Sequence, residues 1–373
     1  MIIVLKPRLE DPAATVSEVT RVAARFAGIE VRPYTFHGTQ QEVTEVHLIG
    51  VTADVPTDLF ESLPGVLRVV RVSTRYRLLG RHDDHTESVG FEYNGVRFDD
   101  RTLNVLAGLC AVDTVEHVEA MMAALQQAGI VTTRMGAYKP RTSPYDFQGL
   151  GKACLPYVFE LAGRYGIRAV AMEVTDARHI EEIHEALADA GEPTGVLLQV
   201  GTRNAQNFEL LKAVGQQREL PVLFKRGMGI TLEEALNACE YIATEGSRDI
   251  VFCLRGVKSH LGDPHRNLID FSHVPVVKRL TRLPVCIDPS HSAGRKLVAP
   301  DGLTDIHHAT AEGVILGANM VLVDVHPRPA QALCDGPQAL TLDELPPYLD
   351  DVSVVRAAYE QRIARPKLAD KHV

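Results

Sequence analysis

The feature that most constrains the fold is a regular alternation of short apolar runs with amphipathic stretches between residues 104 and 327. Eight of these runs have the length and composition of strands. Parallel strands that are buried on both faces are continuously apolar, and eight strand–helix units in roughly 250 residues are typical of a TIM barrel. The predicted barrel strands are residues 104–110, 131–138, 168–174, 195–201, 221–227, 249–256, 284–291 and 320–327.

Helical periodicity occupies the stretches between these strands. Among the expected helices are residues 115–128, 177–190, 231–245 and 271–281, and residues 352–363 follow the last strand. The same alternation could build a doubly wound α/β sheet, but no GxGxxG motif follows the first strand of this region. The sequence therefore favours the (β/α)8 barrel, with the doubly wound sheet as the alternative.

The first 80 residues have a different pattern. Strand-like runs at residues 2–5, 29–33, 46–51 and 66–72 alternate with helical stretches at 16–26 and near 58–63, in the order βαββαβ of a ferredoxin-like α+β domain. A polar stretch at 81–88 and a hairpin-like piece at 91–98 follow, and we interpret the RHDDH within this stretch as a linker and not as a metal site. The expected domains are 1–80 (ferredoxin-like), 81–100 (linker and hairpin) and 101–373 (barrel).

Composition narrows the possible partners. The net charge of −9 argues against a basic surface for nucleic acid, and nowhere do about 18 apolar residues run together as a membrane span requires. The N-terminus lacks the pattern of a signal peptide, so we expect a cytoplasmic protein. The cysteines have no CxxC spacing, and we expect most of them to be reduced core thiols. They are Cys110, Cys154, Cys239, Cys253, Cys286 and Cys334.

Polar residues gather where the predicted strands end, which is where barrel enzymes build their sites. The most conspicuous is the run KPRTSP, at residues 139–144, in which two cations and two hydroxyls lie on a backbone that prolines stiffen. For any one of these residues a surface or turn role is the alternative. The residues at the strand ends are Cys110, Lys139, Arg141, Glu173, Arg203, Lys225, Arg226, Arg255, Asp288, His291, Asp324 and His326.

The residues at the strand ends fall into two groups, possible metal ligands and cations. Cys110, His291 and Asp324, with Asp335 in the next loop, offer sulfur, nitrogen and oxygen donors that suit a borderline divalent cation such as Mn, Fe, Co or Zn. Asp324 and His326 have the same strand parity, so either could point into the barrel mouth. The cations would repel one another unless anions lay between them, which indicates phosphorylated, carboxylated substrates.

Adjacent strand residues face opposite ways, so Lys225 and Arg226 cannot both point inward unless the strand has ended. 

Six segments together resemble the class I 3-deoxy-D-arabino-heptulosonate 7-phosphate (DAHP) synthases, and the N-terminal segment is similar to the ferredoxin-like extension of the I-beta branch. The segments are AGLC, GAYKPRTSPYDFQGLG, QVGTRNAQNF, LFKRGM, IDPSHSAGR and VHPRPAQALCDGPQ. The resemblance implies a metal-dependent TIM barrel that condenses phosphoenolpyruvate with erythrose 4-phosphate, the first step of the shikimate pathway and of aromatic amino acid biosynthesis.

The resemblance also implies roles for individual residues, with Lys139 and His291 as the catalytic pair. The implied ligands of one divalent metal are Cys110, His291, Asp324 and Asp335. The implied phosphoenolpyruvate site comprises Arg134, Lys139, Glu173, Arg203, Lys225, Arg226 and Arg255. The implied erythrose 4-phosphate site comprises Lys139, Pro140, Arg141, Thr142 and Ser143. In the family the N-terminal domain can bind an aromatic amino acid effector, and a homo-oligomer of two or four subunits is expected.

Three departures from the family pattern keep alternatives open. Asp324 stands where the family has glutamate, Leu254 replaces the glutamate of an ERG motif, and the run VKSHLGDPHRN at 257–267 differs from the corresponding family loop. We do not expect the loop residues His260 and His265 to form a second metal site. KPRT favours erythrose 4-phosphate, because the related octulosonate synthases carry a KANRS-like loop. The alternatives are condensation of phosphoenolpyruvate with another aldehyde or sugar phosphate, and a non-catalytic barrel that binds phosphometabolites.

Overall fold

The computed structural model describes residues 1–37, 42–52, 55–71, 76–81, 89–191 and 194–365. Internal contacts divide the chain into two compact units, Met1–Thr86 and Glu87–Val373. Nearly all of the 81–88 stretch that the sequence predicts as a linker, with its RHDDH run, lies outside the described residues. Each unit is described by itself below.

The N-terminal unit is a four-stranded antiparallel sheet with the strand order β2-β3-β1-β4. Its helix α1 begins after Asp11, whose carboxylate accepts a hydrogen bond from Ala14 N at 2.9 Å and so caps the helix. Ile3, Val46 and Phe60 form part of its apolar core. This arrangement confirms the predicted ferredoxin-like domain. The elements are β1 (Ile2–Leu5), α1 (Pro12–Ala23), β2 (Glu30–His37), β3 (Glu42–Ile49), α2 (Asp58–Glu61) and β4 (Val66–Val70).

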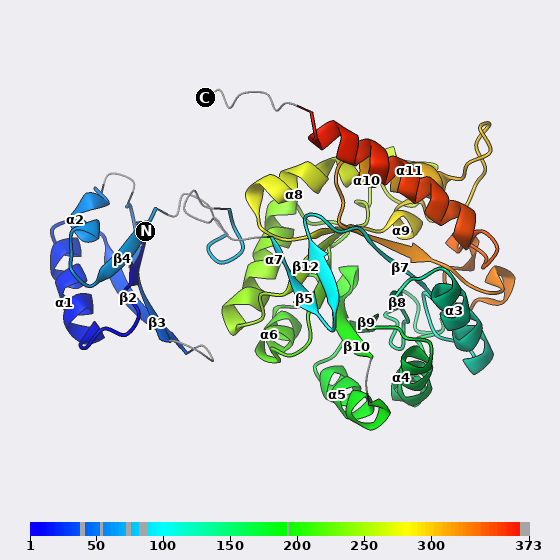
Figure 1. Cartoon of the computed structure of the whole chain (residues 1–373), viewed down its shortest axis with the longest axis horizontal. Coiled ribbons are helices and arrows are strands. Elements are labelled where there is room, and N and C mark those ends of the chain that lie inside the picture. Colours follow the sequence, from blue (N-terminus) through cyan, green and yellow to red (C-terminus); the bar gives the residue numbers. More distant parts are fainter. Residues whose placement is uncertain (38–41, 53–54, 72–75, 82–88, 192–193, 366–373) are drawn as a thin grey trace. The chain divides into compact units, whose positions relative to one another are not determined.

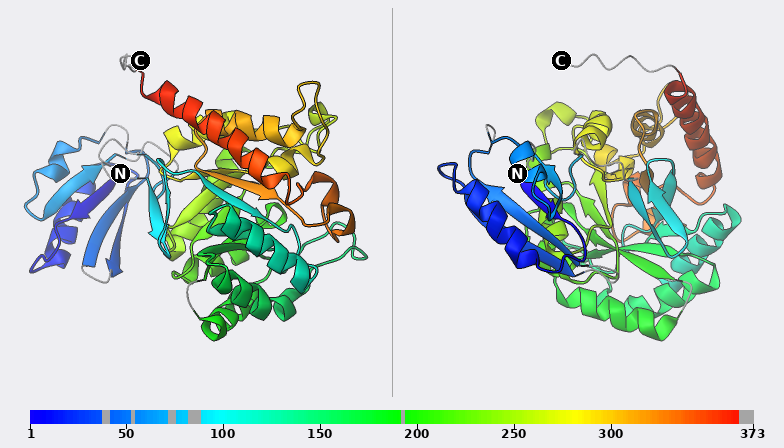
Figure 2. Two further views of the ribbon diagram at one scale, coloured as in Figure 1. Left: turned by 45° about the vertical axis from the view of Figure 1, so that its right-hand side comes forward. Right: turned by 60° about the vertical axis from the view of Figure 1, so that its left-hand side comes forward.

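The second unit is a closed barrel of eight parallel strands, which confirms the TIM barrel and excludes the doubly wound sheet. Figures 1 and 2 show its strands at the centre with the helices around them. Every strand residue from β9 to β14 is buried, because helices cover the outside and side chains fill the inside. The strands are β7 (Asn104–Gly108), β8 (Thr132–Arg134), β9 (Ala169–Val174), β10 (Gly195–Val200), β11 (Val222–Lys225), β12 (Ile250–Leu254), β13 (Val285–Ile287) and β14 (Met320–Asp324).

All of the barrel strands except β9 end earlier than the sequence predicts, and the differences are largest for β8 and β13. β8 stops at Arg134, four residues before the expected end at Tyr138, and the chain then passes close to Cys110 at Gly136. A Cβ added at Gly136 would lie only 2.2 Å from the carbonyl oxygen of Cys110. β13 stops at Ile287, and Pro289 then opens a helical turn, since proline cannot donate to a strand ladder.

The helices that the sequence predicts are present within a few residues, and α4, α6 and α10 complete the set between the strands. The last helix begins at Leu345, earlier than the predicted start at residue 352. Pro346 lies in its first turn, where a proline does not interrupt the helix. The helices are α3 (Val115–Gln127), α4 (Leu155–Arg164), α5 (Arg178–Ala190), α6 (Phe208–Gln216), α7 (Leu232–Glu245), α8 (Val274–Leu280), α9 (Pro289–Ala293), α10 (Asp305–Ile315) and α11 (Leu345–Ile363).

A hairpin covers the N-terminal end of the barrel. Its strands β5 (Gly90–Tyr93) and β6 (Val96–Asp99) are joined by an Asn94–Gly95 turn in which both residues have positive φ. Phe98 is 1% exposed and packs with barrel residues that include Leu106 and Leu197. The hairpin that the sequence places beside the linker is therefore part of the barrel core.

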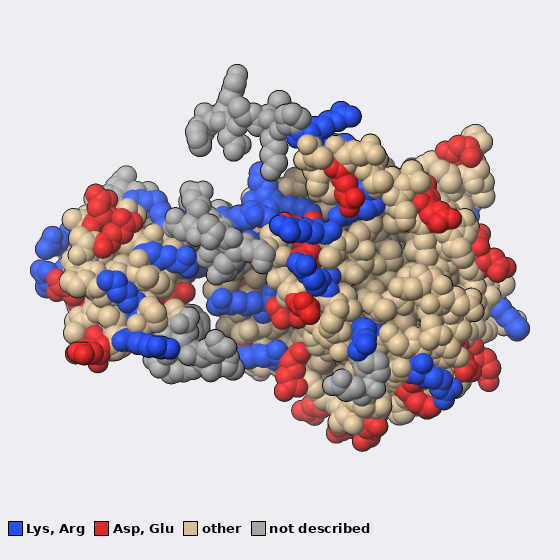
Figure 3. All heavy atoms as spheres, in the orientation of Figure 1, with Lys and Arg blue, Asp and Glu red and all other residues tan. Residues whose placement is uncertain are grey.

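The helices and the charged surface agree with the sequence, which has no long apolar run and a negative net charge. Of the helices described, none combines the length and the apolar character that crossing a bilayer requires. On the face of the barrel drawn in Figure 3, Lys and Arg lie interspersed with Asp and Glu.

Replacing Phe98 with alanine should destabilise the barrel by about 3–5 kcal/mol, because a buried aromatic ring leaves a cavity that the surrounding strands cannot fill. The free energy of unfolding in denaturant, followed by far-UV circular dichroism, measures this change. Tyr145, which is 96% exposed, is the matched control: Tyr145→Ala should shift the same quantity by less than about 0.5 kcal/mol. Equal losses in the two variants would refute the role of the hairpin in the core.

Candidate active site

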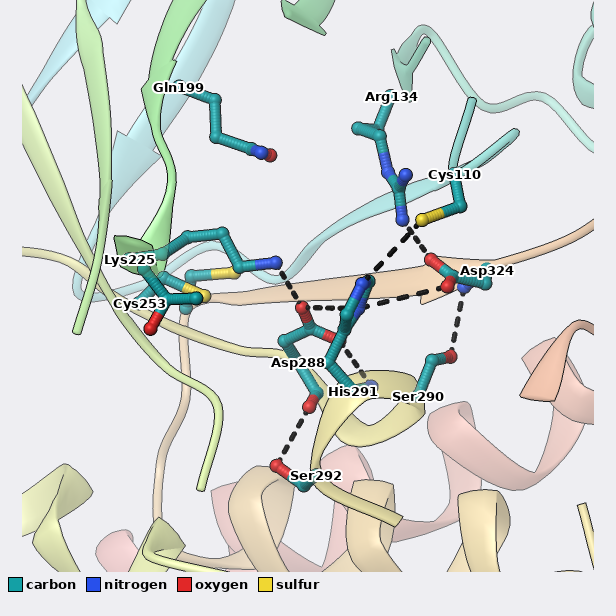
Figure 4. Close-up of polar contacts among 12 residues, drawn as sticks. Cys110, Arg134, Gln199, Lys225, Cys253, Asp288, Ser290, His291, Ser292 and Asp324 are labelled. Atoms are coloured by element: carbon teal, nitrogen blue, oxygen red, sulfur yellow. Dashed lines mark hydrogen bonds and ion pairs between the residues drawn. The ribbon is translucent and has the colours of Figure 1, made fainter. Parts of the chain in front are cut away.

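One buried carboxylate organises the centre of the site. Asp288 follows β13 and caps α9, accepting a hydrogen bond from His291 N at 3.0 Å. Its other oxygen lies 2.9 Å from His291 Nδ1, and Lys225 at the end of β11 donates to the same carboxylate (Figure 4). Burial alone would raise the pKa of Asp288, but His291 and Lys225 hold it well below its usual value. Burial likewise opposes protonation of His291, yet the Asp288 carboxylate raises its pKa to about 10.

The four predicted metal ligands lie together. Donor atoms of Cys110, His291, Asp324 and Asp335 all fall within 4.8 Å of one another. His291 Nε2 lies 3.6 Å from Cys110 Sγ and 3.6 Å from Asp335 Oδ2, and the Cys110 thiol donates to Asp335 Oδ2 at 3.0 Å. Sulfur, imidazole nitrogen and carboxylate oxygen in this arrangement fit a borderline divalent cation.

Asp324, the last residue of β14, is held by other protein groups. Its Oδ1 accepts a hydrogen bond from Arg134, and its Oδ2 accepts one from Gln338 Nε2 at 2.6 Å. The carboxylate lies 3.7 Å from His291 Nδ1, the ring nitrogen that Asp288 also contacts. Asp324 and Arg134 are 1% and 2% exposed, so this ion pair is fully removed from water.

His326 does not point into the barrel mouth, although its strand parity allowed this. Its Nε2 lies 2.8 Å from Asp113 Oδ2, and its Nδ1 accepts a hydrogen bond from Arg328 N at 2.9 Å. Asp113 also lies 3.1 Å from His117 Nδ1. These three acidic and imidazole side chains form a compact cluster, but both nitrogens of His326 are engaged by protein groups. The cluster ties the loop after β7 to the loop after β14.

A cavity of about 210 Å³ lies beside the metal-type residues, at the C-terminal ends of the strands. Most of the predicted substrate-binding residues line it, together with His291 and Asp335. Arg134, Ser143 and Arg226 are predicted binding residues that do not line it. The lining comprises Lys139, Pro140, Arg141, Thr142, Asp146, Glu173, Gln199, Gly201, Thr202, Arg203, Lys225, Met228, Arg255, Arg266, His291, Cys334 and Asp335.

The Lys and Arg side chains of the cavity differ in how many of their hydrogen-bond donors have a partner in the protein. Lys139 Nζ lies 2.8 Å from Cys110 Sγ, between the metal-type residues and the cavity. Burial lowers the pKa of Arg255, which is 3% exposed, and its Nε and Nη1 have no hydrogen-bond partner among the described residues. A buried guanidinium with free donors at a cavity wall is suited to an anionic ligand.

Arg226 faces away from Lys225, in agreement with the alternation of side chains along a strand. It donates to Asp270 at 2.8 Å and to the carbonyl oxygen of Ile230 at 3.1 Å. These partners satisfy its charge outside the cavity. Its predicted part in phosphoenolpyruvate binding stays a prediction, and the contacts that the structure gives it are with the loops that support β11 and β12.

The KPRTSP run forms the rim of the cavity. Arg141 Nη1 lies 2.8 Å from Cys334 Sγ, and its Nη2 lies 3.3 Å from Asp146 Oδ2. Arg203 Nη2 donates to Thr142 Oγ1 at 3.2 Å. Ser143 accepts from Tyr145 N at 3.3 Å and stabilises its own turn instead of lining the cavity.

The structure places in the site several residues that were not assigned to it from the sequence. Gln199 donates to Glu173 at 3.3 Å, and its signal was a single amide within the buried strand GVLLQV. Arg266, in the divergent 257–267 loop, donates to Asp335 Oδ1 at 3.0 Å. Cys334 was grouped with the expected reduced core thiols, and nothing in the spacing of the cysteines places it 4.0 Å from Cys110.

The prediction for the cysteines themselves is confirmed, since all six are buried and free of disulfides. His260 and His265 are not part of the metal-type cluster, and the nearest carboxylate to His265 that the structure gives is Asp305, at 3.7 Å.

Comparison with known proteins identifies two family models. Residues 88–356 match the DAHP synthetase I family, and residues 1–74 match the DAHP synthase ferredoxin-like domain. A phospho-2-dehydro-3-deoxyheptonate aldolase of Thermotoga maritima is 36% identical over 92% of this chain and 94% of its own length. A 2-dehydro-3-deoxyphosphooctonate aldolase of Geobacter sp. strain M21 is 26% identical over 70% of this chain and 94% of its own length.

Solved structures agree with the sequence matches. The crystal structure of the Thermotoga maritima phospho-2-dehydro-3-deoxyheptonate aldolase (DAHP synthase) superposes with a TM-score of 0.69 at 34% identity, over 96% of this chain and 97% of that chain. A truncated form of 3-deoxy-D-arabino-heptulosonate 7-phosphate synthase from the same organism gives a TM-score of 0.65 at 31% identity, over 76% of this chain and 97% of that chain. The chain therefore belongs to the DAHP synthetase I family and carries the ferredoxin-like N-terminal domain of its I-beta members.

Proposed function

We propose that this enzyme condenses phosphoenolpyruvate with erythrose 4-phosphate in a metal-dependent reaction that yields DAHP and phosphate, the first step of the shikimate pathway. The observation that carries the proposal is the pairing of two features in one cavity. The buried, partly unsatisfied guanidinium of Arg255 stands at one wall, and a Cys–His–Asp donor set stands at another. An anionic substrate and a polarising cation would thus meet at the same place.

The phosphoenolpyruvate end of the cavity is its most buried part. Arg255 and Lys225 are 3% and 4% exposed, and Lys139 joins them from the KPRTSP run. We assign these three cations to the phosphate and carboxylate of phosphoenolpyruvate. Because Asp288 already pairs with Lys225, that ammonium is held in position before a substrate arrives. Glu173, fixed by Gln199, lies in the same wall and is suited to orienting a proton or a water molecule.

The acceptor end lies at the rim. Arg141 and Thr142 offer a guanidinium and a hydroxyl to the phosphate of erythrose 4-phosphate, and Arg203 reaches Thr142 from the end of β10. Lys139 lies between the two ends and next to Cys110 Sγ. We therefore assign it the movement of a proton between the reacting groups, in addition to binding.

The residues present fit a divalent metal. Cys110, His291 and Asp335 converge, and Asp288 orients His291 through Nδ1 so that Nε2 faces the other two donors. Asp324, the fourth predicted ligand, lies 3.7 Å from His291 Nδ1. A metal held there would polarise the aldehyde of the acceptor as a Lewis acid.

Condensation with another aldehyde or sugar phosphate is the second candidate, and one observation favours it. Arg266, from the divergent 257–267 loop, lines the cavity, and Asp146 places a carboxylate next to Arg141 at the acceptor end. An aromatic amino acid effector on the N-terminal domain and a homo-oligomer of two or four subunits also stay predictions.

Replacing Cys110 with alanine removes a predicted metal ligand, so it should lower metal affinity by more than about 100-fold and abolish metal-dependent turnover. For comparison, changing a residue that only hydrogen-bonds to a ligand typically lowers metal affinity or activity by about 10- to 100-fold. Metal content after dialysis and the rate of phosphoenolpyruvate consumption measure the two effects. Cys154→Ser is the matched control, since Cys154 is buried and donates only to Gly151 O. Full activity of Cys110→Ala in metal-replete buffer would contradict the assignment.

Arg255→Gln should raise the KM for phosphoenolpyruvate by about 10- to 100-fold, because one charge-assisted hydrogen bond contributes roughly 1.5–3 kcal/mol. Steady-state kinetics with phosphoenolpyruvate as the varied substrate test this. Arg164→Gln, which removes an exposed helix cation, serves as the control and should leave KM unchanged. An unchanged KM for Arg255→Gln would remove this guanidinium from the substrate site.

The choice of acceptor is tested with a panel of aldoses and their phosphates. We expect erythrose 4-phosphate to give the highest kcat/KM, because Arg141 and Thr142 are placed for a phosphate at the rim. Phosphate release in the presence of phosphoenolpyruvate and metal reports turnover. No turnover with erythrose 4-phosphate combined with turnover of another aldose would establish the second candidate.

A further inference from the structure

The oxygens of Asp324 are already occupied by protein donors. Arg134 pairs with Oδ1, and Gln338 Nε2 donates to Oδ2 at 2.6 Å. Arg134 is also fixed by its bond to the carbonyl oxygen of Leu109 at 3.2 Å. A metal at Asp324 would compete with Arg134 and Gln338 for these two oxygens, and weakening the pair with Arg134, which is 2% exposed, is unfavourable.

The contacts of His291 leave Nε2 as the nitrogen available to a metal. Nδ1 is the nitrogen near Asp324, at 3.7 Å, and Asp288 engages that same nitrogen at 2.9 Å. Nε2 faces Cys110 and Asp335 instead, at 3.6 Å from each donor atom. A metal on Nε2 therefore has its other ligands on the side of Cys110 and Asp335.

Cys334 supplies a further donor on that side. Its Sγ lies 3.1 Å from Asp335 Oδ2 and 4.0 Å from Cys110 Sγ. Two sulfur atoms bound to one tetrahedral zinc, each at about 2.3 Å, lie about 3.8 Å apart, so the two sulfurs are close to the spacing that a shared ion requires. Arg266 holds the other oxygen of Asp335, Oδ1, at 3.0 Å, which leaves Oδ2 turned toward both sulfurs and His291.

Each sulfur also has its own cation. Lys139 Nζ lies 2.8 Å from Cys110 Sγ, and Arg141 Nη1 lies 2.8 Å from Cys334 Sγ. Two thiolates and a carboxylate around a divalent ion carry a net charge of −1, and these two cations offset it. Cys334 thus shares two features with Cys110, namely contact with Asp335 Oδ2 and a neighbouring cation.

We propose that Cys334 is a ligand of the catalytic metal, so that the ion is held by Cys110, Cys334, His291 and Asp335 while Asp324 serves to fix Arg134 and Gln338. The inference rests on the metal-dependent function proposed above and changes its ligand set. Binding forms two metal–sulfur bonds and releases the two thiol protons to solvent. A site with two sulfurs favours softer ions, namely Zn, Fe(II) or Co, over Mn.

Cobalt(II) titration of the metal-free, full-length protein under a thiol-free reductant tests the ligand set without measuring activity. The near-ultraviolet thiolate-to-cobalt band should have the intensity of two sulfurs in the wild type, and about half of that intensity in Cys334→Ser. Cys154→Ser should retain the full band. Asp324→Asn should also retain it, because the proposal places no metal bond on Asp324.

Zinc K-edge X-ray absorption of the unmodified protein counts the sulfurs independently of any variant that fails to fold. Two sulfurs at about 2.3 Å are expected. A single sulfur, or a cobalt band that Cys334→Ser leaves unchanged, overturns this inference while the metal-dependent function stands. The absence of any cobalt band in the wild type overturns the metal centre and the inference together.

Discussion

The site depends on how the buried carboxylate of Asp288 is shared between two cationic partners. A fully buried carboxylate is strongly unfavourable unless it is paired, and here a strand lysine and a helical histidine pair with it from different elements. Sharing the charge fixes the direction of the Lys225 ammonium toward the cavity and of the His291 ring toward the donor set. One interaction, formed where β13 ends and α9 begins, therefore positions both a predicted substrate-binding group and a predicted metal ligand.

The cations in and around the cavity differ in whether a buried carboxylate pairs with them. Lys225 and Arg134 are neutralised by buried carboxylates, whereas Arg255 keeps two donors without partners in the described structure. An arginine of this kind is destabilising in the free protein, since its donors have lost water and gained nothing. Such a group is typical of binding sites, and it supports the proposed role of Arg255 in holding an anion.

The architecture and most of the site could be predicted from the sequence because they follow from periodicity. Apolar runs of strand length locate the barrel, and the C-terminal ends of parallel strands must meet at one face, so Cys110, His291 and Lys225 could be grouped without coordinates. The contacts of individual side chains could not be predicted in this way. Asp324 and His326 share a parity, yet one pairs with Arg134 and the other with Asp113. The proximity of Cys334 to Cys110 depends on how a loop folds back after β14, where Asp335 adopts positive φ.

The hairpin beneath the barrel limits how the reaction can be ordered. Phe98 and its neighbours pack into the N-terminal end of the barrel, and among the described residues the cavity lies at the opposite end. The most buried cations, Arg255 and Lys225, then lie beyond the exposed Arg203 and Thr142 on a single route of entry. A ligand at the rim blocks the passage of one bound deeper. Under the proposed function, the substrate held by the inner cations would therefore have to bind before the acceptor.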